Sequence, residues 1–146
     1  MGKGRDRPAV RAVSRRIAQS KAGVAMVEFA LLLPIFLTLL FGILTYGHYY
    51  YLAHTLQQLA NDAARATLGG LTTGERSTLA QQSVTGGIVA TPFVKTRMVV
   101  QTTDDTPFVR VSVRYDASDF PLFKTSLVPV PDPVIQRTAA VRMGGL

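Results

Sequence analysis

The sequence predicts an α+β protein in which a long N-terminal helix precedes a small domain with a short helix and about three antiparallel strands. Two observations are an apolar run from Val24 to Gly47 and an alternating segment from Phe108 to Tyr115. A third is the helical spacing of apolar residues after the apolar run. We expect four segments: a basic cytoplasmic leader at 1–23, a transmembrane helix at 24–47, an amphipathic helical extension at 48–70 and a small exported α+β domain at 71–146.

Positive charge is concentrated ahead of the apolar run. The formal net charge is +7, and residues 1–21 hold seven Lys and Arg side chains against the single acid Asp6. Lys and Arg beside a membrane span resist translocation, so we expect the leader in the cytoplasm and the C-terminal domain beyond the membrane. Binding of DNA by the leader is the alternative. The leader has no aromatic residues among its basic ones and no folded element that could recognise bases. We therefore expect no nucleic-acid partner.

The apolar run is long enough to span a membrane. A helix over 24–47 is roughly 36 Å long, against about 30 Å for the hydrocarbon core. Its one charged residue is Glu28. The run exceeds the apolar region of a signal peptide, and no small-x-small site follows it directly, so we expect no cleavage after it. Four tyrosines mark either the far membrane interface or a face that packs on another helix: Tyr46, Tyr49, Tyr50 and Tyr51.

The helical pattern continues beyond the span. Apolar residues recur at steps of three and four, at Leu52, Leu56, Leu59, Ala63 and Ala66. Gly69-Gly70 supplies a stop signal, so one helix is expected from near residue 24 to near residue 68. The apolar stripe of its outer half needs a partner, and the distal domain is the obvious one.

The distal domain is predicted to begin with a short helix and a hairpin. A Thr-rich start and Gly86-Gly87 bound the helix within 71–91. Strands at Thr96–Thr103 and Phe108–Tyr115 are joined by a turn at Asp104–Pro107. In the second strand one face carries Val109, Val111, Val113 and Tyr115.

A proline-bearing loop and a third strand complete the domain. The loop contains Pro121, Pro129, Pro131 and Pro133, which preclude a central strand there. The last strand is expected over Val134–Met143. One of its faces carries Ile135, Ala139, Val141 and Met143, interrupted by Arg137.

The junction between leader and span carries the functional signal. Gly23 ends the leader, and Glu28 and Phe29 follow within the apolar helix. A carboxylate in a membrane helix is costly and usually has a specific partner. If the chain were cut between Gly23 and Val24, Glu28 would lie about one turn from a new α-ammonium group. In a bundle, the carboxylate of one subunit could then neutralise the amine of its neighbour. The alternative is a lone carboxylate that snorkels to the cytoplasmic interface.

This junction resembles the processing site of type IV pilin-like proteins. The resemblance implies that a prepilin peptidase cleaves after Gly23, that Val24 is the first mature residue and that Glu28 is the fifth. Phe29 completes a Glu-aromatic pair that is typical of the Flp or Tad branch.

Within that branch the chain is similar to the TadE-like minor pilins or pseudopilins. The matching features are the run Val27–Ala30, Pro34, the Ala63–Ala66 segment and the late order of strand, proline loop and strand. The resemblance implies a protein of the bacterial cytoplasmic membrane that assembles with other pilins and the pilus machinery into a Tad/Flp adhesion pilus. Pro34 removes one helical hydrogen bond and is expected either to kink the span for packing between subunits or to kink it without consequence. The chain is longer than a major Flp pilin, and it lacks the cysteines of many TadE-like proteins.

Other functional classes receive little support. An unprocessed, signal-anchored envelope protein with an exported binding domain is the main alternative. His48 and His54 are six residues apart, about 240° around a helix, so they cannot bind one metal from one face. Asp104-Asp105 is interpreted as part of a turn. The absence of cysteine excludes disulfides, thiolate metal sites and a cysteine nucleophile. We expect no enzymatic activity, cofactor or metal.

Overall fold

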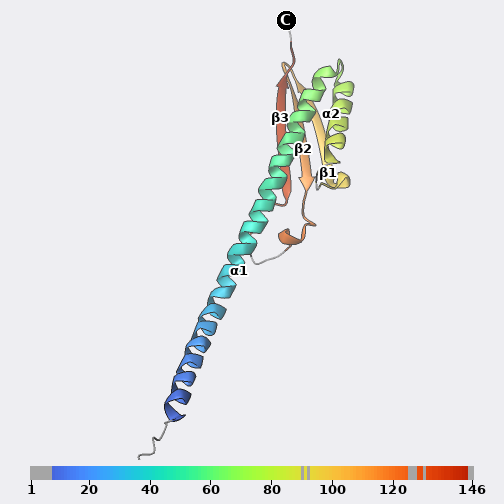
Figure 1. The fold of residues 1–146 in the computed structure, drawn as a ribbon. Helices are drawn as coiled ribbons and strands as arrows, with labels where there is room; N and C mark the ends of the chain where they lie inside the picture. Colours follow the sequence, from blue (N-terminus) through green and yellow to red (C-terminus); the bar gives the residue numbers. More distant parts are fainter. Residues whose placement is uncertain (1–7, 90, 92, 125–127, 130, 145–146) are drawn as a thin grey trace, which may run out of the picture. The chain divides into compact units, whose positions relative to one another are not determined.

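A long helix, α1, begins the computed structural model, which describes residues 8–89, 91, 93–124, 128–129 and 131–144; the side chains of 8–20 and 22 lie outside the description. α1 comprises Pro8–Ala66 and is followed by a 3-10 turn, Thr67–Gly69 (Figure 1). The helix was expected to begin near residue 24 and begins at Pro8 instead. Proline suits the first helical position because its φ is fixed and its missing N–H would have no partner there. The leader's Ala, Arg and Gln residues are good helix formers whatever their polarity.

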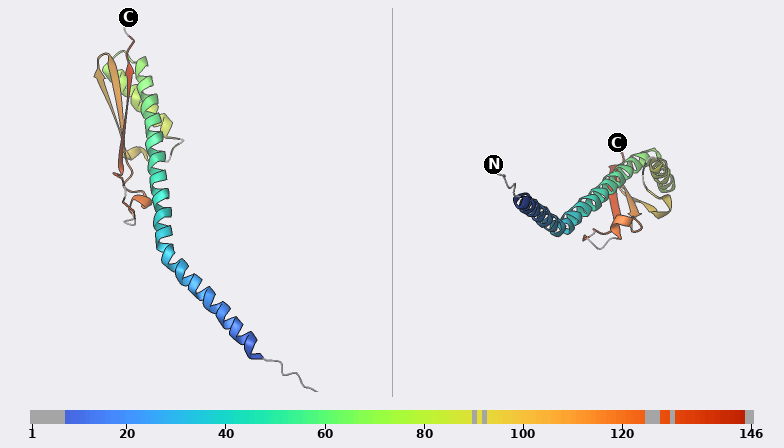
Figure 2. Two further views of the ribbon diagram at one scale, coloured as in Figure 1. Left: turned by 90° about the vertical axis from the view of Figure 1, so that its left-hand side faces the viewer. Right: turned by 60° about the horizontal axis from the view of Figure 1, so that its bottom comes forward.

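The chain forms two compact units, Met1–Leu40 and Phe41–Leu146, which we call the N-terminal unit and the C-terminal unit. The described part of the N-terminal unit is helical throughout. The C-terminal unit contains the rest of α1, then α2 (Thr73–Ile88), β1 (Met98–Asp105), β2 (Phe108–Asp116) and β3 (Val134–Arg142). The strands form one antiparallel sheet in the order β1-β2-β3. The predicted α+β class is confirmed (Figure 2).

The strands lie close to their predicted positions, with one shift. A 3-10 turn at Lys95–Arg97 takes the residues where β1 was expected to begin. β1 instead extends through Asp104 and Asp105, because the hairpin turn needs only Thr106 and Pro107 and pairs Asp105 with Phe108. The proline loop contains one short 3-10 turn, Pro121–Phe123, and no strand among its described residues.

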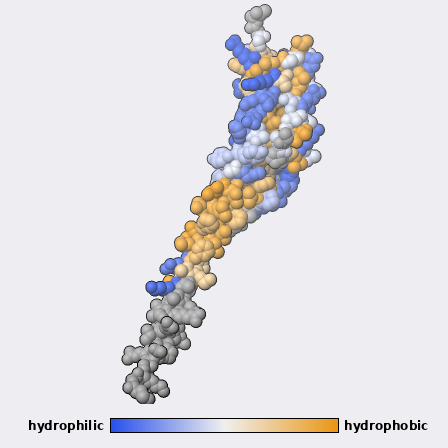
Figure 3. All heavy atoms as spheres, viewed as in Figure 1, coloured by the Kyte–Doolittle hydropathy of each residue, from blue (hydrophilic) through white to orange (hydrophobic). Residues whose placement is uncertain are grey.

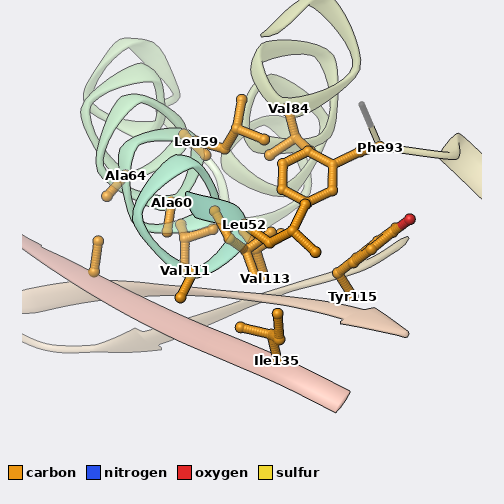
Figure 4. Close-up of a cluster of buried hydrophobic side chains, with 14 of the residues drawn as sticks. Leu52, Leu59, Ala60, Ala64, Val84, Phe93, Val111, Val113, Tyr115 and Ile135 are labelled. Atoms are coloured by element: carbon orange, nitrogen blue, oxygen red, sulfur yellow. The ribbon is translucent and has the colours of Figure 1, made fainter. Parts of the chain in front are cut away.

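The core lies between the two helices and one face of the sheet (Figure 4). The apolar stripe of α1 is buried as predicted, except that Ala66 is only half-buried: Leu52, Leu56, Leu59 and Ala63 are covered. From the sheet, the predicted faces of β2 and β3 point into the same cluster, with Val111, Val113, Tyr115, Ile135 and Ala139 buried. Three further alanines, Ala53, Ala60 and Ala64, are buried on α1. Because their side chains are small, they let the helix lie close to the strands.

α2 begins at a capping box and ends later than predicted. The Thr72 side chain accepts a hydrogen bond from the Glu75 N–H, and the Glu75 carboxylate accepts one from the Thr72 N–H. Gly86-Gly87 was expected to end this helix, but the helix continues through both glycines to Ile88. A Cβ on Gly87 would overlap the Leu59 side chain. Gly87 therefore permits the close approach of α2 to α1 rather than marking a helix end.

Arg76 and Asp104 join the start of α2 to β1. The Arg76 guanidinium donates to Asp104 Oδ2 at 2.9 Å, and the Thr73 hydroxyl donates to the same oxygen at 2.6 Å. The Thr73 hydrogen bond, with help from Arg76, lowers the pKa of Asp104 below its ordinary value. Arg76 Nε also donates to the Gly70 carbonyl at 3.1 Å. Asp104 is therefore a strand residue that holds α2 to the sheet. The prediction that it belongs to the turn was wrong.

Gly70→Ala is expected to destabilise the C-terminal unit by about 1–3 kcal/mol, because its side chain would overpack a closed site. A Cβ at Gly70 would lie 2.8 Å from the backbone nitrogen of Arg76, an atom that cannot move aside without shifting α2. Gly69→Ala is the control, since its Cβ would meet only Leu79 Cδ1 at 3.7 Å. Thermal unfolding of the full-length chain in detergent, followed by circular dichroism, compares the two. Equal unfolding midpoints for both variants would contradict the steric argument.

Candidate processing and assembly segment

All five residues singled out at the junction lie on α1 within the N-terminal unit: Gly23, Val24, Glu28, Phe29 and Pro34. Each is exposed. The structure therefore places them on one helix that nothing else in the described part of this unit covers. Their functional roles stay predictions, since a single chain contains neither a peptidase nor a neighbouring subunit.

The expected cleavage bond lies within a continuous helix. α1 passes through Gly23 and Val24 without a break, and a Cβ on Gly23 would meet no atom within 4 Å. Steric space therefore does not explain the glycine. Glycine in a helix interior is about 1 kcal/mol less favourable than alanine. The helix is thus intrinsically weak at the bond where a peptidase would have to unwind it.

Glu28 is a carboxylate without a partner in the described chain. Val24 and Glu28 are one helical turn apart and share a face, while Phe29 lies about 100° further around. No hydrogen bond or ion pair of the Glu28 carboxylate is found among the described residues. An unpaired carboxylate on an apolar helix is costly in a membrane. We expect a partner for this charge in another molecule or at the membrane surface.

The helix around Glu28 presents bare apolar side chains on every side. Leu31 is 71 % exposed, and the residues that follow on other faces, such as Leu32 and Ile35, are also exposed. The stretch Gly23–Gly69 is long and apolar enough to cross a membrane, and its most apolar part is wholly unburied. Figure 3 shows this hydrophobic surface on the helix, in contrast to polar side chains over much of the visible face of the C-terminal unit. The bare, most apolar part of this stretch is a candidate membrane anchor.

Pro34 lies inside α1, where helical structure continues on both sides. Its missing N–H leaves the Ala30 carbonyl without the usual helical donor. One turn later, the Thr38 hydroxyl donates to the Pro34 carbonyl at 2.8 Å. A hydrogen bond of this kind, from threonine to the carbonyl four residues earlier, often bends a helix. The predicted kink and its role in packing between subunits stay predictions.

The two histidines make structural contacts in the C-terminal unit. His48 stacks on Phe120 with ring centroids 3.8 Å apart and an angle of 8° between the planes. His54 Nε2 lies 3.1 Å from the Gln58 amide nitrogen on the next turn. Among the described residues, no group of three or more potential metal-ligating side chains is present.

The stacked histidine borders a shallow cavity of about 200 Å³. Its wall includes Phe120 and the ion-paired side chains Arg97 and Asp119. The sequence did not predict this cavity, because three segments far apart in the chain form it, at 48–52, 94–97 and 115–121. It equally missed the hydrogen bond from the Tyr46 hydroxyl to the Pro129 carbonyl, at 2.9 Å, which joins α1 to the proline loop. No local pattern in the sequence signals either contact.

The first part of α1 is apolar and exposed, and its later part packs on the sheet of an α+β unit. This arrangement defines a candidate membrane-anchored protein. Residues 23–65 match the family model described as TadE-like protein. The match begins at Gly23 and includes the other four junction residues, and it covers less than a third of the chain. No curated protein and no solved structure matches the chain. The resemblance to TadE-like proteins is thus confirmed for the candidate membrane anchor and most of the outer part of α1, and it suggests a protein associated with a Tad pilus.

Proposed function

We propose that this protein is a minor pilin or pseudopilin needed to assemble a Tad/Flp-type adhesion pilus. The observation that carries the proposal is the spacing of Gly23, Glu28 and Phe29 at the start of a bare apolar helix. The family match over 23–65 supports it, because that match begins at the same glycine. The protein has no catalytic role in this proposal.

The proposed sequence of events has three steps. The chain inserts with its basic leader in the cytoplasm, because positive charge beside a span resists translocation. A prepilin peptidase cleaves between Gly23 and Val24, which leaves a new α-ammonium group on the helix. The trimmed helix then packs among other pilin helices, where Glu28 supplies the charge that neutralises such an amine.

An unprocessed, signal-anchored envelope protein is the second candidate. The observation that favours it is the unbroken course of α1 from Pro8 through the expected cleavage bond. In this case the leader stays attached, and the C-terminal unit binds an envelope component. Glu28 would then lie at the cytoplasmic interface, where its carboxylate snorkels into water.

The mass of the mature chain separates the two candidates. In membranes from cells with an active prepilin peptidase, we expect a chain that lacks residues 1–23 and begins at Val24, by intact mass and by N-terminal sequencing. Gly23→Leu is expected to keep its leader, because a bulky side chain would occupy the position that the peptidase accepts as glycine. Gly47→Leu is the control, since its Cβ also meets open space on the same helix.

Processing of the control but not of Gly23→Leu supports the pilin proposal. A wild-type chain that still begins at or near Met1 in those cells would overturn it. Equal processing of both variants would show that Gly23 does not define the cleavage site.

A further inference from the structure

One turn of α1 has two different sides. The residues Gly42, Thr45 and Tyr46 lie on one face, because successive helical residues are about 100° apart. Ile43 lies about 160° around the helix from Thr45, and Leu44 lies about 160° from Tyr46. Ile43 is 63 % exposed, whereas Thr45 is 1 % exposed. At this level the helix is therefore covered by protein on one side and bare and apolar on the other.

The cover is the proline loop. Figures 1 and 2 show the segment after β2 beside α1 at the end of the C-terminal unit far from the C-terminus. A Cβ on Gly42 would lie 3.8 Å from the Val128 side chain, and the Tyr46 hydroxyl donates to the Pro129 carbonyl. The loop residues Val128 and Pro129 thus lie at the same height along the helix as the bare Ile43.

The bare side belongs to the apolar run of the proposed anchor. No Asp, Glu, Lys or Arg occurs between Glu28 and Asp62. An exposed Ile43 and Leu44 in that run favour contact with lipid over water. Because Val128 and Pro129 lie at the same height along the helix as Ile43, what surrounds Ile43 at this level is expected to reach these two loop residues as well.

The loop chemistry suits an environment with little water. In a bilayer each backbone polar group needs a partner within the protein. Proline carries no N–H, so Pro129 and Pro131 remove two backbone donors that would otherwise each need an acceptor. The Pro129 carbonyl accepts a hydrogen bond from Tyr46. Formal charges return only at Lys124 and Asp132, one on each side of this stretch.

We propose that Val128 and Pro129, two described residues of the proline loop that lie beside α1, lie in the lipid bilayer at the boundary between headgroups and acyl chains, as a second membrane contact of the C-terminal unit. The apolar face of an amphipathic helix that lies in the interface reaches about 5–10 Å into this boundary, which gives the scale expected here. The proposal rests on the membrane anchoring in the proposed function. Its consequence is that the C-terminal unit is held against the bilayer surface until the helix leaves the membrane for the pilus.

Fluorescent labels at single cysteines test this directly, because the chain has no cysteine of its own. Val128→Cys, Ile43→Cys and Gln82→Cys, in the full-length chain, are each labelled with a nitrobenzoxadiazole maleimide. The labelled proteins are reconstituted in phosphatidylcholine–phosphatidylglycerol vesicles that contain lipids with nitroxides on the upper acyl chain. Gln82 is the control, as an exposed residue of α2. Pro129→Cys repeats the loop measurement and keeps the carbonyl that Tyr46 binds.

The lipid nitroxides are expected to quench the labels at Ile43 and Val128 to a similar extent, and several-fold more than the label at Gln82. Quenching at Ile43 with a Gln82-like response at Val128 and Pro129 would overturn the loop proposal and leave the anchoring intact. No quenching at Ile43 would overturn the anchoring and the loop proposal together.

Discussion

Replacing Leu56 with alanine is expected to lower the free energy of unfolding of the C-terminal unit by about 2–5 kcal/mol. Leu56 is fully buried and belongs to the cluster that joins α1 to Val113 and Ile135 of the sheet. Truncation removes its transfer free energy and leaves a cavity, because the neighbouring strands cannot close around the gap. The loss is large for a unit of this size, whose total stability is expected to be about 5–15 kcal/mol.

The measurement is the thermal unfolding midpoint of the full-length chain in detergent. A loss of this size corresponds to a decrease of about 10 °C or more. Leu71→Ala is the matched control, because the same side chain is 89 % exposed there and its contacts are made by backbone atoms. Similar midpoints for the two variants would show that α1 is not held to the sheet by this cluster.

The outer part of α1 and the central strand could be predicted because their buried apolar residues recur with the period of a helix or a strand. Leu52, Leu56 and Leu59 repeat at helical steps, and β2 alternates between core and solvent, so each pattern reports its own element. The start of α1 could not be predicted in this way. The change from polar to apolar residues near 24 marks a change of environment, whereas helix formation by the leader depends on backbone propensity.

Contacts between distant segments produce no such periodic pattern in the sequence. Arg76 and Asp104 were separate features of the sequence, and only the fold brings their charges within 2.9 Å. Gly87 resembled a helix stop because the sequence does not show that Leu59 lies against it. The candidate site behaves in the opposite way. Its spacing was visible in the sequence, but its proposed partners are other molecules, so the structure of one chain adds only that Glu28 is exposed and unpaired among the described residues.

Replacing Glu28 with alanine is expected to leave insertion and cleavage intact while pilus assembly is strongly impaired. The apolar run keeps its length, and Gly23 and Val24 are unchanged, so the membrane span and the cleavage signal remain. In the assembled bundle the variant leaves a neighbouring α-ammonium group buried without its counter-charge. Breaking a buried ion pair by removing one partner costs about 3–5 kcal/mol. This loss corresponds to a decrease of about 100-fold or more in the association constant.

Glu28→Gln distinguishes charge from size, because it keeps the shape of the side chain and removes its negative charge. Intact mass of the membrane form reports cleavage of both variants, and the amount of sheared surface pili reports assembly. We expect normal cleavage and few pili for both. If charge pairing sets the register of the helices, Glu28→Asp retains more pili than Glu28→Gln, although its carboxylate is one methylene shorter. Normal piliation of Glu28→Gln would show that the carboxylate has no pairing role. The presence of a carboxylate in an apolar helix would then need another explanation.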